Sequence, residues 1–339
     1  MPDWLLAATL LLGCPAAWWL TGRIRRHALA RGVLDLPNPR SSHTEPTPRG
    51  GGLAIVAVVL AGLPLLWWQG ELPARVVVAI AGSGALIAWV GWRDDQRHVA
   101  VHWRLAAHLL AAAWGLAWLG GLPPLEIAGR TLEPGWVGTV LGVLYLTWLL
   151  NLYNFMDGID GIAAVEAVTV AAGGALVLWL AAPQAGWYVP LLPAAAAAGF
   201  LAWNFPRARI FMGDGGSGFL GLLFGLLSLQ AGWLAPELAW AWLILLGVFV
   251  VDASWTLLRR LTRGESLHQA HRGHAYQVAA RRVGSHVPVT AAVALVNLAW
   301  LWPLAALVAT GRVSGPAGLA LAYAPLLAAA AALSGRAAP

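Results

Sequence analysis

The sequence predicts an all-α, polytopic integral membrane protein, and two observations lead to this fold class. Hydrophobic residues make up 59% of the 339 residues and charged residues only 11%, with a mean hydropathy of +0.69. A soluble domain is nearer one quarter charged. The apolar residues also fall into blocks of roughly 17–23, the length of a helix that crosses about 30 Å of hydrocarbon. This composition excludes an ordinary soluble globular protein.

We expect about 11 transmembrane helices (10–11). The first segment lacks a basic stretch before its apolar run and a convincing cleavage site, so we interpret it as a retained span and not as a signal peptide. The predicted spans are about 3–21, 52–69, 75–92, 103–120, 136–153, 160–182, 186–204, 216–234, 237–258, 288–310 and 315–334.

The basic residues predict the orientation of these spans. All 21 are arginine, and if the N-terminus is outside, 18 of them fall in inner loops or the inner tail. Only Arg75, Arg130 and Arg312 fall outside, which follows the positive-inside rule. The net charge of +6 therefore acts first as an insertion signal and second in attraction to anionic lipid, and it needs no nucleic-acid partner.

The polar residues gather on the predicted cytoplasmic face. We expect a single transmembrane domain over residues 1–339, because the longest loops are short for independent folding. The lone Cys14 lies within a span, which excludes a disulfide framework. The cytoplasmic loops are expected at about 22–51, 92–103, 151–160, 204–216 and 259–287.

The stretch "NLYNFMDGIDG" places Asn151, Asn154, Asp157 and Asp160 three residues apart. On a helix such a row drifts slowly around one face. Carbonyl and carboxylate oxygens gathered in this way suit a hard cation such as Mg²⁺. The alternative is a polar helix cap followed by glycine stops.

Adjacent carboxylates, Asp94 and Asp95, follow the third predicted span. Neighbouring helical residues point in different directions, so one is expected to face a cavity, where it would act as a base or organise the site. The alternative is a solvated helix end paired with Arg93 and Arg97.

Asp214 comes just before the glycine-rich entry to the eighth span, where Ser217 is a candidate helix cap. Free N–H groups at a helix N-terminus favour phosphate oxygens, and Asp214 is suited to hold a cation that neutralises them. The alternative is a tight turn with an aspartate cap.

Two basic motifs complete the face. The first, "HQAHRGHAYQ", carries His271, Arg272 and His274, and it favours a pyrophosphate over zinc because no cysteine or HExxH arrangement accompanies it. The second ends in Arg49 and the glycines 50–52, which permit close backbone approach at the start of the second span. For both motifs the alternative is a basic loop that only connects two spans and fixes the topology.

Together these motifs predict an enzyme that carries out phosphoryl transfer at the cytoplasmic leaflet, since this chemistry needs alignment and charge neutralisation more than covalent catalysis. A polyprenol-lipid transporter or flippase is a rival, although it would be expected to carry polar groups through to the other face. A metal-dependent membrane lipid phosphatase is a second rival, which would release free phosphate.

In the same order, the motifs resemble those of the polyprenyl-phosphate N-acetylhexosamine-1-phosphate transferases, glycosyltransferase family 4, which includes WecA, TagO and MraY. The resemblance runs from about Asp35 to His274 and is closest to the WbpL-type branch, which starts O-antigen or related glycan synthesis. It rests on "PRSSHTEPTPRGGGLAI", "DD" at 94–95, "NLYNFMDGIDGIAAVEA", "FMGDGGSGFLG" and "HRGH".

The resemblance implies that a UDP-N-acetylhexosamine donates sugar-1-phosphate to undecaprenyl phosphate, giving undecaprenyl-diphospho-sugar and UMP. It further implies a multi-pass location in the bacterial inner membrane and a need for Mg²⁺, with Mn²⁺ as the second candidate; a homodimer is left open. The run "HRGH", where MraY-like members carry several histidines, argues against a muramyl-pentapeptide donor.

Matching the motifs residue by residue implies the following roles. Asp94 deprotonates or orients the lipid phosphate, beside a less settled Asp95. Asn154 and Asp214 belong to the metal site. Some relatives have a phosphate-binding lysine after the paired aspartates; this chain has no lysine, and Arg104 is the nearest substitute. The implied substrate-binding residues are Asn151, Asp157, Asp160, His271, Arg272, His274, Arg49 and Arg104.

Overall fold

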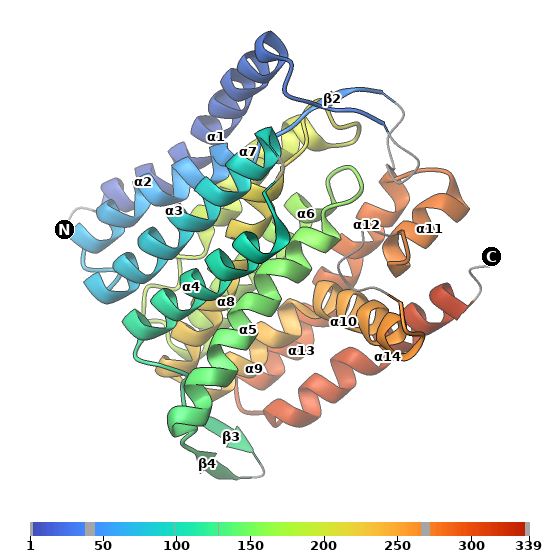
Figure 1. Cartoon of the computed structure of the whole chain (residues 1–339). Helices are drawn as coiled ribbons and strands as arrows, with labels where there is room; N and C mark the ends of the chain where they lie inside the picture. The colour runs from blue at the N-terminus through green and yellow to red at the C-terminus, as the bar shows by residue number, and fades with distance from the viewer. Residues whose placement is uncertain (1–2, 38–44, 98, 128, 266–271, 336–339) are drawn as a thin grey trace.

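A computed structural model describes residues 3–37, 45–97, 99–127, 129–265 and 272–335 (Figure 1). Helices make up 76% of the described residues, and two short antiparallel strand pairs, β1 with β2 and β3 with β4, are the described strands. The elements are α1 Asp3–Arg31, β1 Leu34–Asp35, β2 Thr47–Pro48, α2 Leu53–Trp68, α3 Ala74–Gln96, α4 Val101–Leu119, β3 Leu125–Ile127, β4 Arg130–Leu132, α5 Gly135–Met156, α6 Ile162–Ala181, α7 Leu191–Asn204, α8 Asp214–Leu234, α9 Pro236–Leu245, α10 Gly247–Thr262, α11 Ala275–Val283, α12 Val287–Val296, the π-helix η1 Asn297–Leu301, α13 Trp302–Ala309 and α14 Gly315–Gly335.

The all-α class is confirmed, and each predicted span coincides with a helix or a run of helices. Within the described residues, six helices are long and apolar enough to cross a membrane, or seven if the bent pair α9 and α10 forms one span. The fold is therefore that of a polytopic helical membrane protein. The count of eleven spans and their orientation stay predictions.

Helices extend into several of the predicted cytoplasmic loops. The loop expected at 22–51 begins as helix, because α1 continues to Arg31 and ends where Gly32 takes a positive φ of 68°. Arginine is a good helix former, so the helix does not stop where the apolar residues do. The loop 92–103 is likewise mostly helix, since α3 runs to Gln96 and α4 starts at Val101, and the loop 259–287 contains α11.

The span predicted at 237–258 is not one straight helix. α9 and α10 meet at a bend of 70° next to Leu246. After Glu237 in its first turn α9 is apolar, whereas α10 carries Asp252 in its interior and ends in Arg259 and Arg260. Because ionisable groups are costly in hydrocarbon, a straight continuation of α9 through this sequence would be unfavourable.

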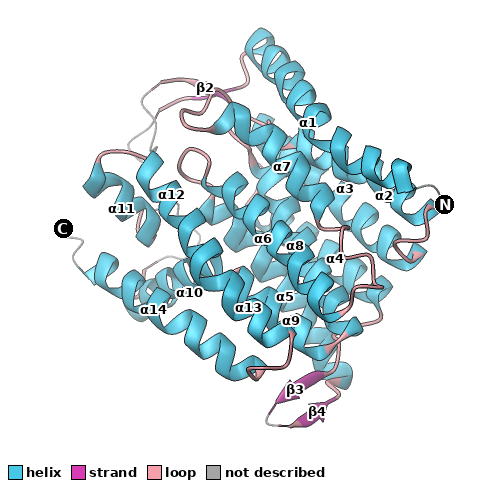
Figure 2. Ribbon diagram, turned by 180° about the vertical axis from the view of Figure 1, so that it is seen from behind, coloured by secondary structure: helices cyan, strands magenta, loops and turns pink. Residues whose placement is uncertain are grey.

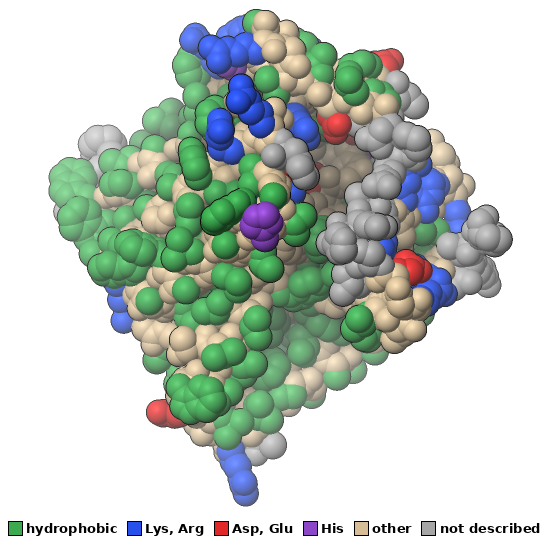
Figure 3. All heavy atoms as spheres, in the orientation of Figure 1, with side chains coloured by type: hydrophobic (Ala, Val, Ile, Leu, Met, Phe, Trp, Pro, Cys, Tyr) green, Lys and Arg blue, Asp and Glu red, His purple; other side chains and the backbone are tan. Residues whose placement is uncertain are grey.

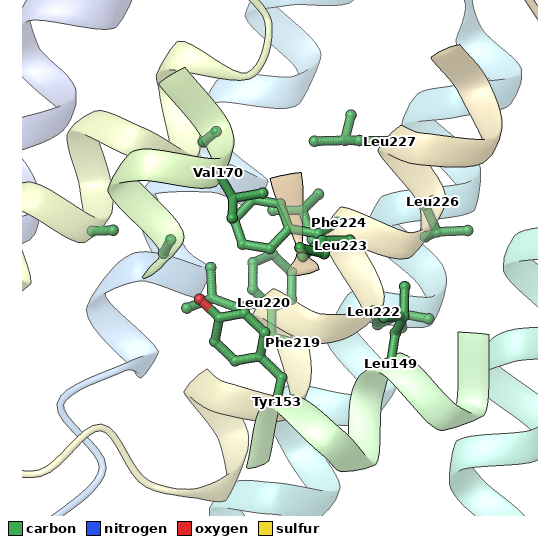
Figure 4. Close-up of a cluster of buried hydrophobic side chains, with 14 of the residues drawn as sticks. Leu149, Tyr153, Val170, Phe219, Leu220, Leu222, Leu223, Phe224, Leu226 and Leu227 are labelled. Carbon is green, nitrogen blue, oxygen red and sulfur yellow. The ribbon is translucent and has the colours of Figure 1, made fainter. Parts of the chain in front are cut away.

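Helix α8 lies at the centre of the bundle and contacts α2, α3, α4, α5, α6 and α9. Apart from Asp214, Ser217, Ser228 and Gln230, its residues are apolar or glycine on every side, which is the pattern of a buried helix. Figure 4 shows its side chains Phe219, Leu220 and Phe224 packed against Tyr153 of α5 and Val170 of α6. This rigid core fixes where the ends of α3, α5 and α8 lie.

Glycines bring the helix ends closer than other residues would allow. A Cβ added to Gly91 in α3 would overlap the backbone of Gly215 and Asp214. A Cβ added to Gly52 would lie 2.6 Å from the Cα of Gly216, and the Gly52 N–H donates to the Met212 carbonyl at 2.9 Å. The close approach predicted for the triple glycine is confirmed, and its partner is the entry to α8.

The two ends of the bundle differ in polarity. The β3–β4 hairpin lies at one end (Figure 2), where Trp240 Nε1 donates to the Glu126 carbonyl at 3.2 Å. Figure 3 shows hydrophobic side chains over the wall of the bundle and arginine side chains gathered towards its upper end. The ends of α3, α5 and α7 and the starts of α4, α6 and α8 meet at the end opposite the hairpin.

Candidate active site

A charged cluster forms where four helices end or begin. Asp94 lies in the last turn of α3, Arg104 in the first turn of α4, Asn154 in the last turn of α5, and Asp214 is the first residue of α8. Arg104 Nη1 lies 2.6 Å from Asp94 Oδ2 and 3.7 Å from Asp214 Oδ2. Asn154 Nδ2 donates to Asp214 Oδ1 at 3.0 Å. One arginine thus lies between two carboxylates from different helices.

Asp94 and Asp95 have different partners. The second oxygen of Asp94 accepts the Val99 N–H at 2.7 Å, which fixes the turn between α3 and α4. Asp95 is buried, lies 3.8 Å from Arg49 Nη1, and accepts the Asp214 N–H at 3.3 Å. Asp94 therefore pairs with Arg104 and Asp95 with Arg49. The described ion pairs include none of either aspartate with Arg93 or Arg97, which the alternative interpretation expected.

The N-terminus of α8 differs from the prediction. Ser217 is not its cap: the residue before the helix is Gly213, and no side chain caps it. Ser217 lies one turn inside, where its hydroxyl donates to the Gly213 carbonyl at 3.1 Å and accepts from Asn154 at 3.0 Å. The first N–H of α8 is taken by Asp95, so a carboxylate of the chain already occupies part of the expected anion site.

Asp157 follows α5 and lies near the cluster. Burial raises its pKa, and the neighbouring carboxylates of Asp214 and Asp160 add to the effect, giving a value of about 7. Its loop is held by α11, because Tyr276 donates to the Phe155 carbonyl at 3.0 Å and its hydroxyl fills the space where Gly158 would carry a Cβ.

A narrow pocket opens beside these residues. Asp94, Arg104, Asn154 and Asp214 form its polar part, together with His108 one turn further along α4. Its apolar walls are Ile87, Val90 and Leu150, and glycines 91 and 218 complete the lining. The pocket is thus lined by both charged and apolar side chains, around a space of about 10 Å³ that has room for one water molecule.

Two of the predicted residues have other partners. Asn151 Nδ2 donates to the Thr147 carbonyl of its own helix at 2.7 Å, and its side chain lies against His108. The carboxylate of Asp160 lies 3.3 Å from His286 Nδ1, and its carbonyl accepts from Thr290 at 2.8 Å. Asp160 therefore ties the loop after α5 to the start of α12.

The predicted basic loop is described only in part. His271 lies outside the described residues. The Arg272 carbonyl accepts from Arg281 at 2.8 Å. His274 is only 2% exposed; its Nδ1 is 3.5 Å from Asp252 Oδ1, and its ring stacks with Phe155 at a centroid distance of 6.4 Å. His274 thus belongs to the packing between α5, α10 and α11.

Mg²⁺ is the metal implied by the resemblance, and the donor set can be compared with its needs. No three His, Cys, Asp or Glu side chains in the described ranges form a metal-binding group by themselves. Mg²⁺ is usually bound by one or two carboxylates together with water and substrate phosphates. The Asp214 side chain is 34% exposed, and the buried Asp95 Oδ2 has no hydrogen-bond partner among the described residues. These oxygens fit an ion whose remaining ligands come from a phosphate substrate.

Sequence reasoning gave too little weight to Asp252 and His108. Asp252 accepts the N–H groups of Ala275 at 2.8 Å and Tyr276 at 2.9 Å, and so holds the N-terminus of α11. His108 lines the pocket. Both are ionisable residues inside predicted spans, and such residues mark buried sites in membrane proteins. That signal was available.

Comparison with known proteins identifies the family. The model of glycosyl transferase family 4 matches residues 77–232. A decaprenyl-phosphate N-acetylglucosaminephosphotransferase from Mycolicibacterium smegmatis is 33% identical over 312 residues, covering 79% of this chain and 76% of the relative. The chain belongs to glycosyl transferase family 4. The resemblance inferred from the motifs is confirmed.

Other relatives span the same family. A probable undecaprenyl-phosphate N-acetylglucosaminyl 1-phosphate transferase from Bacillus subtilis is 29% identical, covering 76% of this chain and 72% of the relative. A phospho-N-acetylmuramoyl-pentapeptide-transferase from Chloroflexus aurantiacus is 30% identical, covering 74% and 71%. The matched residues 77–232 include Asp94, Arg104, Asn154 and Asp214.

Proposed function

We propose that this protein transfers N-acetylhexosamine-1-phosphate from a UDP-sugar to undecaprenyl phosphate at the cytoplasmic face of the bacterial inner membrane. The products are undecaprenyl-diphospho-N-acetylhexosamine and UMP. By its resemblance to the WbpL-type branch, the reaction starts the synthesis of O-antigen or another cell-envelope polysaccharide. The names of the relatives from Mycolicibacterium smegmatis and Bacillus subtilis support a polyprenyl phosphate acceptor and an N-acetylglucosamine phosphate group.

One observation supports this function more than any other. Arg104 lies between Asp94 and Asp214, and Asn154 donates to the same Asp214 carboxylate. All four line a small pocket together with apolar side chains. A lipid phosphate needs a cationic group for its head and apolar surface for its chain. The same cluster offers carboxylates for the cation that a diphosphate donor brings.

The roles follow from these contacts. Arg104 binds the acceptor phosphate, and Asp94 orients Arg104 because its two oxygens hold that guanidinium and the α3–α4 turn. Asp214, Asn154 and Asp95 would hold Mg²⁺ or Mn²⁺, and the metal would neutralise the donor diphosphate. Asp157 lies next to Asp214 and faces the nucleotide side of the donor. Arg49 holds Asp95 in place.

We assign a single displacement to the reaction. An oxygen of the acceptor phosphate attacks the sugar-bearing phosphorus of the donor, a new phosphorus–oxygen bond forms, and the bond to UMP breaks. Alignment and charge neutralisation supply most of the acceleration in such transfers. A covalent route through Asp94 or Asp95 predicts a phosphorylated enzyme when donor is present without acceptor, and trapping that species would overturn the single displacement.

Product analysis tests the proposed function. Membranes containing the protein are incubated with undecaprenyl phosphate, Mg²⁺ and a panel of UDP-sugars, including UDP-GlcNAc, and both products are identified. We expect UMP and a lipid diphospho-sugar in equal amounts with at least one donor. Free phosphate in place of UMP would indicate a lipid phosphatase, and transbilayer movement of lipid without either product would indicate a flippase.

The Asp214→Ala variant tests whether Asp214 is needed for turnover and not for folding and membrane insertion. We expect no turnover, while the protein still inserts at wild-type abundance, because the substitution removes the carboxylate that contacts both Arg104 and Asn154. Near-normal activity in this variant would exclude Asp214 from the metal site.

A further inference from the structure

His108 has a position that the roles assigned above do not use. It lies in α4 one turn after Arg104, on the same face of the helix, and both residues line the pocket. Its side chain is nearly inaccessible, with 9% of the residue exposed. The surrounding walls include Ile87, Val90 and Leu150.

The imidazole is incompletely bonded. Asn151 lies against the ring, whereas Nδ1 has no hydrogen-bond partner among the residues that the structure describes. A buried polar atom without a partner costs about 1–3 kcal/mol, and most buried polar atoms are satisfied. In the tautomer that carries the proton on Nδ1, a ligand oxygen that accepts from this N–H would remove that cost.

The lining combines a cationic group with apolar side chains, as a ligand with an anionic end attached to an apolar chain requires. The space inside is about 10 Å³, room for one water molecule, so Arg104 must move for such a ligand to enter. Arg104 supplies the positive charge of this lining. Glycines 91 and 218 let the helices approach closely, because a Cβ on Gly91 would overlap the Gly215 backbone and one on Gly218 would lie 3.1 Å from Ile87.

The negative charges of Asp94 and Asp214 on this lining would repel a bound phosphate unless a cation lies between the carboxylates and the phosphate. Arg104, which contacts both, is that cation in the structure.

We propose that His108 is a second binding residue for the acceptor phosphate, acting together with Arg104. This inference rests on the proposed function. Arg104 rotates away from Asp214 and so opens the pocket, and its guanidinium stays paired with the incoming phosphate. A ring N–H of His108 then donates to a phosphate oxygen from deeper in the pocket. The donor sugar nucleotide does not reach His108, so the two substrates respond differently to its loss.

The experiment measures steady-state kinetics of the full-length protein in nanodiscs, varying undecaprenyl phosphate at saturating donor and the donor at saturating acceptor. His108→Met fills the space with an adaptable apolar side chain and removes the ring N–H that would donate a hydrogen bond to the phosphate. His108→Gln keeps an N–H donor. The matched control is His102→Gln, because His102 lies on the same helix but is exposed and outside the pocket.

We expect His108→Met to raise the KM for undecaprenyl phosphate about tenfold or more, in the range of a hydrogen bond to a charged group. The KM for the donor should stay within about twofold, and His108→Gln should recover most of the loss. If His108→Met fails to insert, His108→Ala, which only removes atoms, makes the same comparison.

Three results would overturn the inference: an unchanged acceptor KM in a folded His108→Met protein, a parallel rise in both KM values, or an equal effect of His102→Gln. In each, the wild type still makes UMP. If the wild type neither binds nor consumes undecaprenyl phosphate, the proposed function itself fails. The two failures are therefore distinguishable.

Discussion

Arg104 contacts two carboxylates, Asp94 and Asp214, which come from different helices. Its planar guanidinium can form two parallel hydrogen bonds with one carboxylate or phosphate, which a lysine ammonium cannot. Under the proposed function, binding of an acceptor phosphate here would exchange one of the carboxylate contacts for a phosphate contact. The residue is therefore central to how the pocket admits an anion.

Replacing Arg104 with Gln should lower kcat/KM for the acceptor by about 10²-fold or more, as for other preorganised charges at a reacting group. Arg104→Lys keeps the positive charge but cannot form the two parallel hydrogen bonds, so the loss of kcat/KM should be intermediate. Arg97→Gln is the control, because Arg97 is exposed just after α3. An equal loss in the Arg97 variant would show that only surface charge matters.

Asp94→Asn should abolish turnover while leaving insertion intact. The amide keeps the size of the side chain and loses the charge that holds Arg104 at 2.6 Å. Turnover by purified protein and abundance in the membrane are measured side by side. Wild-type turnover in this variant would rule out any need for the Asp94 charge.

Asp157 makes the stability of the metal-free protein depend on pH. Its folded-state pKa is raised to about 7, above the usual value, by burial and by the carboxylates of Asp214 and Asp160. The folded state therefore binds more protons than the unfolded state between the two pKa values, and stability falls as pH rises from about 4 to about 7. Thermal unfolding in detergent should show this fall, and Asp157→Asn should reduce it. A fall of the same size in both proteins would contradict the assignment.

At the scale of elements, α11 depends on one residue of α10. Asp252 accepts the first two N–H groups of α11 and the Thr256 hydroxyl at 3.1 Å, and it lies beside His274. Tyr276 of α11 in turn bonds the Phe155 carbonyl at the end of α5. A change in α10 is thereby transmitted to the loop that carries Asp157.

Asp252→Ala should loosen α11 and weaken donor binding. We expect faster hydrogen exchange over residues 275–283 and a rise in donor KM of about tenfold, since several hydrogen bonds to one charged group are lost together. Glu237→Ala, at the start of α9, is the control. Unchanged exchange in α11 would mean that other contacts hold this helix.

Much of the fold could be predicted from the sequence, because a long apolar run predicts a membrane-spanning helix without any knowledge of its tertiary contacts. The helix positions of α3, α5, α6, α8 and α14 followed from this signal alone. The 70° bend between α9 and α10 did not, because hydropathy averaged over a window does not register a change of direction. The short α11 was missed because its polar composition resembles a loop.

The site was predictable in part for a similar reason. Aspartates and asparagines at the ends of apolar runs had to meet at a helix end, and Asp94, Asn154 and Asp214 do so. The pairing of Asp160 with His286 and of His274 with Asp252 depends on packing between distant helices. No local pattern encodes such pairings.

At the scale of the whole molecule, the arginines divide between the two ends of the bundle. Arg75 lies at the start of α3, Arg130 in β4 and Arg312 in the turn before α14, all on the hairpin end and away from the charged cluster. This separation predicts the orientation in the membrane, with the cluster in the cytoplasm. Orientation decides whether a cytoplasmic sugar nucleotide reaches the pocket.

Cysteine accessibility tests this orientation. In a Cys14→Ser background, Leu36→Cys places a thiol at a 63% exposed position beside β1, and Thr131→Cys places one in the hairpin. A membrane-impermeant maleimide added to intact cells should label only the Thr131 position, and both after permeabilisation. The reverse pattern would put the cluster on the wrong side of the membrane.

The most direct test of the central claim follows the sugar-bearing phosphorus. UDP-GlcNAc labelled at its β-phosphorus, or the preferred donor found in the panel, is incubated with undecaprenyl phosphate and either wild-type protein or Asp214→Ala at matched abundance. The pocket formed by Asp94, Arg104, Asn154 and Asp214 predicts that the label enters the lipid fraction with the wild type and stays in the nucleotide with the variant. Label that remains in the nucleotide with both proteins, or enters the lipid equally with both, would contradict it.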